Sequence, residues 1–135
     1  MKILLDTNVV LDVLLNRKDF VNDSLAAMEK AISTGDRLYL SATAATDVFY
    51  VVKKITGNSA EALFDMKKLS VIVSFAEVDE ECIFTAAYSR FKDFEDAVVD
   101  AVASHINADC IITRNVDDFV HATNKVMTPK DYLVI

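Results

Sequence analysis

The chain has 135 residues, of which 53% are hydrophobic and 26% charged, and its formal net charge is −7. This length and composition are typical of one globular domain, so we expect a single domain over residues 1–135. The acidic balance argues against broad, nonspecific adhesion to nucleic acid. It does not exclude a nucleic-acid substrate whose binding site has its carboxylates neutralised by metal.

The cysteines and the apolar runs bear on localisation. Cys82 and Cys110 lie in apolar surroundings and are typical of buried free thiols in a reducing compartment. No apolar run approaches a membrane span, and the apolar residues before Asp6 are too few for a signal peptide. We therefore expect a cytoplasmic protein without a membrane segment.

Strand and helix patterns alternate along the chain. The strand patterns are short apolar runs, and the helix patterns have apolar residues at helical spacing between capping residues and glycines. The expected strands are 2–5, 37–40, 71–75, 110–113 and, more weakly, 125–127. The expected helices are 9–15 (capped by Thr7 or Asn8), 19–33 (capped by Asp19), 41–57 (begun by Ser41 or Thr43), 58–68 (with an Asn58–Glu61 capping box), 79–91, 93–107 and a turn or helix from Thr128.

Apolar spacing also predicts which helical residues face the core. Within 19–33 these are Val21, Leu25, Met28 and Ile32, and within 41–57 they are Val48, Val51, Val52 and Ile55. Tyr39, Tyr50, Tyr88 and most phenylalanines have core spacing, which we favour over base stacking.

This alternation, with almost no hairpin turns, predicts an α/β fold with a parallel sheet and helices on both faces. Right-handed crossovers bring the carboxyl ends of parallel strands to one edge of the sheet, where ligands bind. Asp6 directly follows the first strand and lies at that edge. It is either an acid of a functional site or only the cap of the next helix, and this stretch alone does not decide between the two.

Other acids fall near the same edge. They are Asp47 after the second strand, Asp93 and Asp96 before the fourth, and Asp117 and Asp118 after it, together with the amide Asn115. Asp100, further along the helix before the fourth strand, is the exception. Clustered carboxylates without a cation raise one another's pKa and cost stability, and a divalent metal removes that cost. We favour a site role for Asp96 and a helix-capping role for Asp93.

The remaining acids keep two interpretations. Asp47 taken alone is more typical of a solvated helix residue, and Asp117 and Asp118 of turn residues. Asp100 either supports a ligand or is solvated. Other chemistries lack their signals: His105 and His121 have no partner at zinc spacing, and no Gly-rich loop or nucleophile elbow is present.

Three stretches together resemble one known family. The run 3–12 (ILLDTNVVLD) is similar to the first motif of PIN-domain proteins. The runs 93–97 (DFEDA) and 108–119 (ADCIITRNVDDF) resemble the third and fourth motifs of one PIN branch, which often has Thr-Arg-Asn followed by an Asp-Phe pair. The stretches occur in the right order and spacing, and the resemblance covers nearly the whole chain.

The resemblance implies a PIN-like three-layer α/β/α fold with a parallel sheet of about five strands. It also implies a divalent-metal-dependent endoribonuclease, in which acids coordinate Mg²⁺ or Mn²⁺ for hydrolysis of RNA phosphodiester bonds. Many small bacterial and archaeal members are VapC-like toxins of toxin–antitoxin pairs. Such toxins are commonly homodimers held inactive by a cognate antitoxin protein.

Carried onto this chain, the family pattern gives a specific site. Asp6, Asp47 and Asp96 would hold one or two metal ions, with Asn115 or Asp118 completing the set. Thr7 and Thr113 would hydrogen-bond the ligand carboxylates. The residues that would meet substrate phosphates, each equally typical of a solvated charge, are Arg114, Lys92 and Arg17.

Two positions depart from the family pattern. Asp47 stands where the family usually has Glu, and Asn115 where many members have Asp, with Asp118 three residues further on. These departures motivate an alternative: a catalytically weakened PIN-fold module that binds RNA or a protein partner without cleavage.

Overall fold

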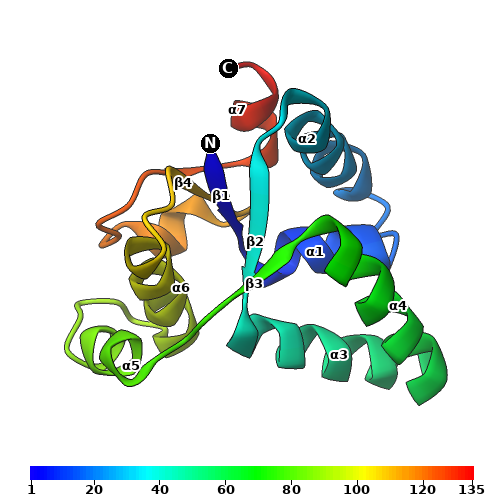
Figure 1. Cartoon of the computed structure of the whole chain (residues 1–135), viewed down its shortest axis with the longest axis horizontal. Helices are drawn as coiled ribbons and strands as arrows, with labels where there is room; N and C mark the ends of the chain where they lie inside the picture. The colour runs from blue at the N-terminus through cyan, green and yellow to red at the C-terminus, as the bar shows by residue number, and fades with distance from the viewer.

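The computed structural model describes residues 1–135 and contains one sheet of five parallel strands in the order β3-β2-β1-β4-β5 (Figure 1). The strands are β1 (Lys2–Leu5), β2 (Arg37–Ser41), β3 (Ser74–Ala76), β4 (Cys110–Ile112) and β5 (Val126–Met127). β1 is the central strand, which explains its continuous apolar sequence, because both of its faces are covered. Residues that follow β1 therefore lie at the middle of the sheet edge.

Helices cover both faces of the sheet. Ile3 and Leu5 belong to one hydrophobic core, and Leu4, which points the other way, belongs to the second. The first core is completed by α1 (Thr7–Leu14), α2 (Val21–Thr34), α3 (Ala42–Thr56), α4 (Ser59–Ile72) and α7 (Pro129–Leu133). The second is completed by α5 (Glu80–Ala87), α6 (Phe94–His105) and the 3₁₀ turn Val116–Phe119. The predicted three-layer α/β/α fold is confirmed.

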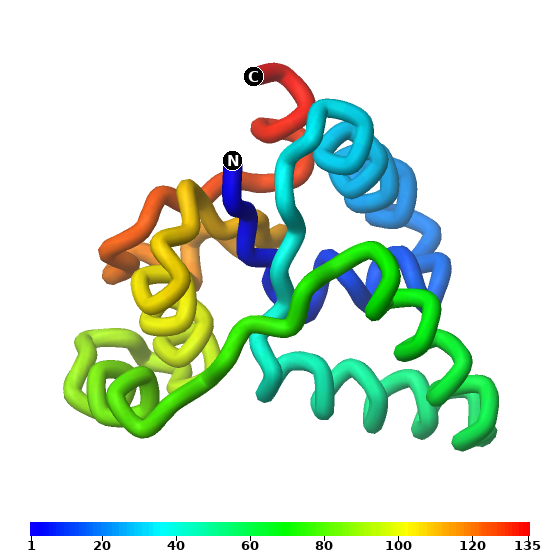
Figure 2. The backbone as a smooth tube through the Cα atoms, in the orientation of Figure 1, coloured from blue at the N-terminus to red at the C-terminus, as the bar shows by residue number.

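Both termini lie at the amino end of the sheet (Figure 2). Asp36, which precedes β2, accepts a hydrogen bond from the N-terminal ammonium at 2.6 Å and one from the Tyr132 hydroxyl at 2.6 Å. Because both termini lie at the amino end, the carboxyl edge of the sheet is free of the chain ends.

None of the helices combines the length and apolar character that a membrane crossing requires.

The helix boundaries differ from the predicted ones at several caps. The cap of α1 is Asp6, whose Oδ1 accepts from the Thr7 backbone N–H, rather than Thr7 or Asn8. Phe20 precedes α2 with no side-chain cap, so Asp19 does not cap it. Ser41, Asn58, Asp79, Asp93 and Thr128 do cap their helices, although the Asn58 box is only half formed. α2 and α3 end at the predicted glycines, Gly35 and Gly57, both in the left-handed conformation.

The third strand was predicted too early in the chain. α4 continues to Ile72, and Val71 is 87% exposed on its last turn. β3 begins only at Ser74 and is a three-residue edge strand. The β-branched residues from Val71 to Val73 favour a strand by propensity, but α4 continues through Val71 and Ile72 and ends at its C-cap, Val73. The helix predicted for 79–91 is also shorter, since α5 ends at Ala87.

Several apolar residues predicted to be buried are exposed. α2 packs on the sheet through Ser24, Ala27, Met28 and Ala31, which leaves Leu25 and Ile32 outside. Small side chains allow this close approach of helix to sheet, and apolar spacing alone does not indicate it. Ile55, Tyr50 and Tyr88 are also exposed, as are the phenylalanines Phe20, Phe64, Phe75, Phe84 and Phe94.

Candidate active site

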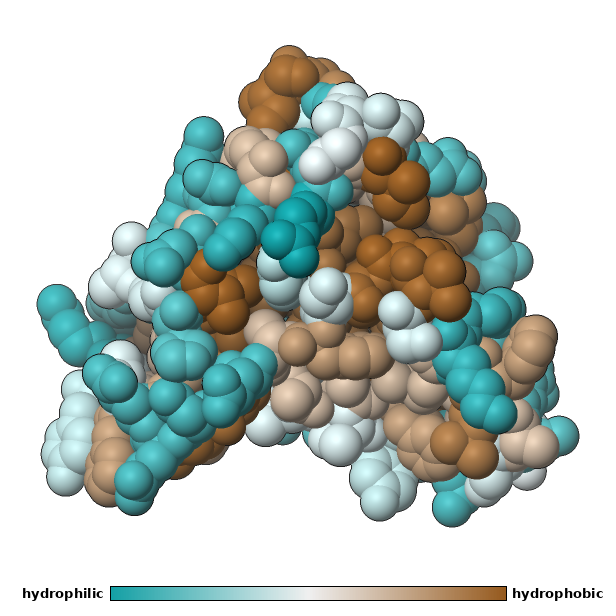
Figure 3. All heavy atoms as spheres, in the orientation of Figure 1, coloured by the Kyte–Doolittle hydropathy of each residue, from teal (hydrophilic) through white to brown (hydrophobic).

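A cleft of about 520 Å³ lies at the carboxyl edge of the sheet, between α3 and α6. Figure 3 shows the molecule hollowed between the parts that carry these two helices, at its lower edge. The cleft is lined by residues that follow β1, β2 and β4 and by the first turn of α6. Its lining includes the acids Asp6, Asp47, Glu95 and Asp96, together with Asn115.

Asp6 is the most buried of these acids, with only 7% of its surface exposed. Its Oδ2 accepts from the Thr113 hydroxyl at 2.8 Å and from the Asn8 amide at 3.3 Å, and its Oδ1 from the Thr7 N–H at 2.8 Å. Burial raises the pKa of the carboxyl, and the Thr113 and Thr7 hydrogen bonds oppose that rise. Asp6 therefore caps α1 and also lines the cleft, and its role as an acid of a functional site stays a prediction.

Asp96 lies in the first turn of α6, beside Asp6. Burial, followed by the negative charge of Asp6, raises the pKa of the Asp96 carboxyl to about 7. Asp93 and Asp118 add to the rise in the same direction. The group is thus poised near neutrality by neighbours that are themselves acids, an arrangement typical of functional sites.

Asp47 and Glu95 face each other across the cleft from α3 and α6. The charge of Asp47 is the largest cause of a raised pKa at Glu95, which shows that these exposed carboxylates are near one another. Glu95 lies within the PIN-like run 93–97 but is not among the predicted site residues. Its proximity to Asp47 arises because α3 and α6 lie on either side of the same cleft, which helical spacing could not reveal.

Asn115 and Asp118 follow β4 and are both exposed. Asn115 lines the cleft, whereas Asp118 lies on the adjoining 3₁₀ turn and reaches the site through its charge, which raises the pKa of both Asp6 and Asp96. Asp117 lies on the same turn outside the cleft and is exposed.

The two threonines predicted to support the carboxylates behave differently. The buried Thr113 hydroxyl donates to Asp6 and itself accepts from Asn8 and from the Asn115 N–H. Thr7 contributes only its backbone N–H to Asp6. Asn8, which was predicted only as a helix cap, links Asp6 to Thr113.

The predicted phosphate-binding cations differ in what they contact. Arg114 Nε donates to the buried Asp12 at 2.7 Å, and its guanidinium lies 3.8 Å over the Phe20 ring. Arg17 lines the cleft and has a longer contact with Asp12, at 3.5 Å. Lys92 is exposed and does not line the cleft.

Asp100 is neither solvated nor close to the cleft. It is 6% exposed and holds the segment before β5: its carboxylate accepts from the backbone N–H groups of Thr123 and Asn124, from the Thr123 hydroxyl and from the Asn124 amide. Its role is to anchor a loop.

The acids of the cleft fit a hard divalent cation. None of Asp6, Asp47, Glu95 and Asp96 forms an ion pair with a basic residue. The pKa values of Asp6, Glu95 and Asp96 are raised, as expected for clustered carboxylates that no nearby positive charge neutralises. Carboxylate and amide oxygens are the donors that Mg²⁺ and Mn²⁺ prefer.

Comparison with solved structures finds the same fold. VapBC2 from Rickettsia felis, bound to a DNA fragment from its promoter, matches with a TM-score of 0.76 and 14% identity over 95% of this chain and 98% of that chain. A toxin–antitoxin complex from Klebsiella pneumoniae matches at 0.68 and 20% identity (93% and 96%). VapC20 from Mycobacterium tuberculosis, described as a sarcin–ricin loop cleaving toxin, matches at 0.63 and 14% identity (81% and 86%).

No curated protein sequence matches the chain. A family model described as PIN domain matches residues 2–117, which include β1 and all of the residues that line the cleft. The chain therefore belongs to the PIN domain family.

Proposed function

We propose that this protein is a divalent-metal-dependent endoribonuclease and the toxin of a toxin–antitoxin pair. The observation that carries the proposal is the convergence of carboxylates from the end of β1, from α3 and from α6 on one cleft without a basic partner. Membership of the PIN domain family supports it, as does the likeness to the fold of a toxin that cleaves RNA at the sarcin–ricin loop.

Asp6, Asp47, Asp96 and Asp118 are the residues that would hold Mg²⁺ or Mn²⁺, with Asn115 as a neutral donor. When bound, such a cation activates water, stabilises charge on the phosphoryl oxygens and stabilises the leaving oxygen. Asn115 lines the cleft, whereas Asp118 lines an adjoining depression that also includes Asn115, so the set has two candidates for its last ligand.

The chain's own residues would orient the reactants. Thr113 and the Thr7 N–H fix the Asp6 carboxylate through two bonds of 2.8 Å. Arg17 at the cleft would meet a phosphate of the RNA, since its contact with Asp12 is long and its side chain is one-third exposed. In hydrolysis a water oxygen forms a bond to phosphorus, the bond to the leaving oxygen breaks, and the leaving oxygen takes a proton from solvent. Glu95, which has a raised pKa and no hydrogen-bond partner, is placed to accept the proton of that water.

Arg114 remains a second candidate for phosphate contact. Only its Nε is used by Asp12, and it lines a neighbouring depression with Asn115. A phosphate there would have to bind the outer guanidinium nitrogens without separating the Arg114–Asp12 pair.

A protein partner is supported by the apolar surface. Large hydrophobic side chains are exposed on the neighbouring helices α3 and α4: Tyr50, Ile55, Leu63, Phe64 and Val71. Brown surface is also visible over the middle of the molecule near the end of α4 (Figure 3). Exposed apolar patches are typical of protein–protein contacts. We propose a homodimer and a cognate antitoxin as the proteins that cover this surface, as the toxin–antitoxin assembly of the Klebsiella relative suggests.

The alternative, a PIN module that binds RNA or protein without cleavage, is favoured by the shorter Asp47 and the neutral Asn115. Calorimetric titration with Mn²⁺ separates the two functions. The nuclease should bind Mn²⁺ in the cleft and lose that binding in Asp6→Asn, whereas no binding at millimolar metal favours the alternative. Cleavage of total cellular RNA, with Mg²⁺ or Mn²⁺ and with EDTA, tests the reaction itself.

A further inference from the structure

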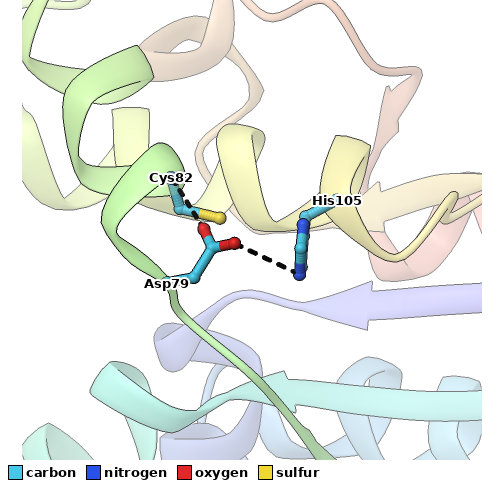
Figure 4. A group of neighbouring side chains, drawn as sticks. All are labelled: Asp79, Cys82 and His105. Atoms are coloured by element: carbon cyan, nitrogen blue, oxygen red, sulfur yellow. Dashed lines mark hydrogen bonds and ion pairs between the residues drawn. The ribbon is translucent and has the colours of Figure 1, made fainter.

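A second group of potential metal ligands lies outside the cleft, where the start of α5 meets the end of α6 (Figure 4). Asp79 is the cap of α5, Cys82 is in its first turn, and His105 is the last residue of α6. One ligand atom from each residue lies within 4.8 Å of the others. Figure 4 shows the thiol, the carboxylate and the imidazole converging from the two helices.

The imidazole of His105 lies near two carboxylates without a hydrogen bond to either of them. His105 Nε2 lies 3.8 Å from Asp79 Oδ2 and 3.9 Å from Glu77 Oε2, and both distances are too long for hydrogen bonds. Zinc–ligand bonds of about 2.0–2.3 Å at tetrahedral angles place neighbouring ligand atoms roughly 3.3–3.7 Å apart. The ligand atoms of Asp79, Cys82 and His105 lie within 4.8 Å of one another, so an inward shift of these side chains would bring them to that spacing. Glu77 is near His105 but outside this group, and its exposed side chain would turn in to complete the set.

Capping of the helix accounts for only part of this arrangement. Asp79 Oδ1 accepts from the Cys82 N–H at 2.9 Å, which uses one carboxylate oxygen and holds Asp79 beside Cys82. The other oxygen, Oδ2, faces the imidazole at 3.8 Å. The Cys82 thiol is buried against α6, whereas His105 and Glu77 are exposed and give an ion access from solvent.

We propose that Asp79, Cys82 and His105, with Glu77 as the fourth ligand, form a site for Zn²⁺ or another borderline-soft transition-metal ion. Thiolate and imidazole donors select such ions, whereas the oxygen donors of the cleft select Mg²⁺ or Mn²⁺. Binding releases the thiol proton to solvent, and the thiolate forms the metal–sulfur bond. The two sites therefore differ in position and in chemistry.

An ion at this position would join α5 to α6. These helices pack on each other in the second core, and α6 carries Glu95 and Asp96 at its other end. Ile83, the residue after Cys82, lines the cleft. Occupancy of the site would therefore stabilise the wall of the cleft that α5 and α6 form.

The test is titration of the full chain with Zn²⁺ and with Co²⁺, under reducing conditions and with excess Mg²⁺ to occupy the cleft. We expect one Zn²⁺ per chain with a Kd below about 1 µM, and a thiolate-to-cobalt charge-transfer band. Cys82→Ala and His105→Gln should each weaken binding by roughly 100-fold or more, and Cys82→Ala should abolish the band. Zn²⁺ should also raise the Tm of the unmodified chain and not that of Cys82→Ala.

Matched controls are available, because the chain has one further cysteine and one further histidine. Cys110→Ala and His121→Gln should keep both the affinity and the cobalt band. Asp79→Asn, which can still cap α5, should weaken binding without unfolding the protein. Binding weaker than about 100 µM, or binding unaffected by Cys82→Ala and His105→Gln, would overturn the proposal. Asp79 and His105 would then form an ion pair only.

Discussion

The Nε of Arg114 donates a hydrogen bond of 2.7 Å to Asp12, whose side chain is fully buried. This pair ties the segment after β4 to α1, and Ser24 of α2 donates to the same carboxylate oxygen at 3.0 Å. Arg114 therefore holds together the elements from which the cleft is built, whatever it contributes to RNA binding. A loss of activity in an Arg114 variant has to be separated from a loss of stability.

Arg114→Ala should lower the free energy of unfolding by about 3 kcal/mol, because the buried Asp12 carboxylate loses its closest charged partner. Arg17→Ala is the matched control. It should cost less than about 1 kcal/mol, since Arg17 is partly exposed and its contact with Asp12 is 3.5 Å. Urea denaturation in EDTA measures both values. Equal effects of the two substitutions would show that the Arg114–Asp12 pair does not stabilise the fold.

The raised pKa of Asp96 predicts how stability changes with pH in the absence of metal. Between its ordinary value of 3.8 and the folded value of about 7, the folded chain keeps a proton that the unfolded chain has lost. The free energy of unfolding should therefore fall as pH rises through this window, and level off above it. Asp96→Asn removes this contribution, so at pH 8 it should raise the free energy of unfolding by roughly 1 kcal/mol, a value reduced because solvent screens the half-buried group.

Asp117→Asn is the control for that experiment, since Asp117 is exposed and outside the cleft. It should leave the pH dependence unchanged. Saturating Mn²⁺ should reverse the order of stability, because the ion stabilises the chain with Asp96 more than the variant. A pH profile of Asp96→Asn that is the same as that of the unmodified chain would contradict the assignment.

Thr113→Val should weaken Mn²⁺ binding by about 10–100-fold while leaving the fold intact, because the Thr113 hydroxyl fixes one oxygen of Asp6. Valine preserves the shape of the side chain and removes the donor. Thr113→Ser keeps the hydroxyl and should retain most of the affinity. Calorimetry compares the three proteins, and identical affinities for Val and Ser would exclude a role for the hydroxyl.

Asp100→Ala should destabilise the chain by about 3 kcal/mol, because four donors of the 123–124 segment lose their acceptor. Hydrogen exchange should become faster in that segment, and Mn²⁺ affinity should stay within a factor of about two, since Asp100 is outside the cleft. Asp100→Asn should be less destabilising because it keeps one acceptor oxygen. A large loss of metal affinity in either variant would show that Asp100 supports the metal site.

The central strands were predictable because their environment determines their sequence. β1, β2 and β4 are covered on both faces and carry continuous apolar runs. β3 was misplaced because an edge strand of three residues has no such pattern, and the neighbouring Val71 and Ile72 belong to α4. Helix ends were predictable where glycine takes the left-handed conformation, as at Gly35.

The candidate site was predictable to the extent that it depends on strand ends. Asp6, Asp47 and Asp96 were expected at one edge of the sheet, and the structure brings them to one cleft. Glu95 was missed because its position opposite Asp47 depends on how α6 packs. Asp12 was missed because an acid in an apolar helix gives no sign of a buried cationic partner far along the chain.

The convergence of Asp79, Cys82 and His105 could not be predicted from the sequence either. His105 was judged isolated because no cysteine or second histidine lies at zinc spacing along the chain. The packing of α5 on α6 brings it near Cys82 and Asp79 in space. Ligand sets assembled by tertiary packing have no fixed spacing that a linear pattern can detect.

The most direct measurement is cleavage of total cellular RNA by the purified protein with Mn²⁺, with Mg²⁺ and with EDTA, beside Asp6→Asn and the exposed control Asp117→Asn. We predict discrete fragments that require the metal, are lost in Asp6→Asn and persist in Asp117→Asn, with Asp6→Asn keeping the helical content of the unmodified chain. Cleavage by Asp6→Asn at the rate of the unmodified protein, or cleavage unaffected by EDTA, would contradict a metal-dependent nuclease centred on Asp6.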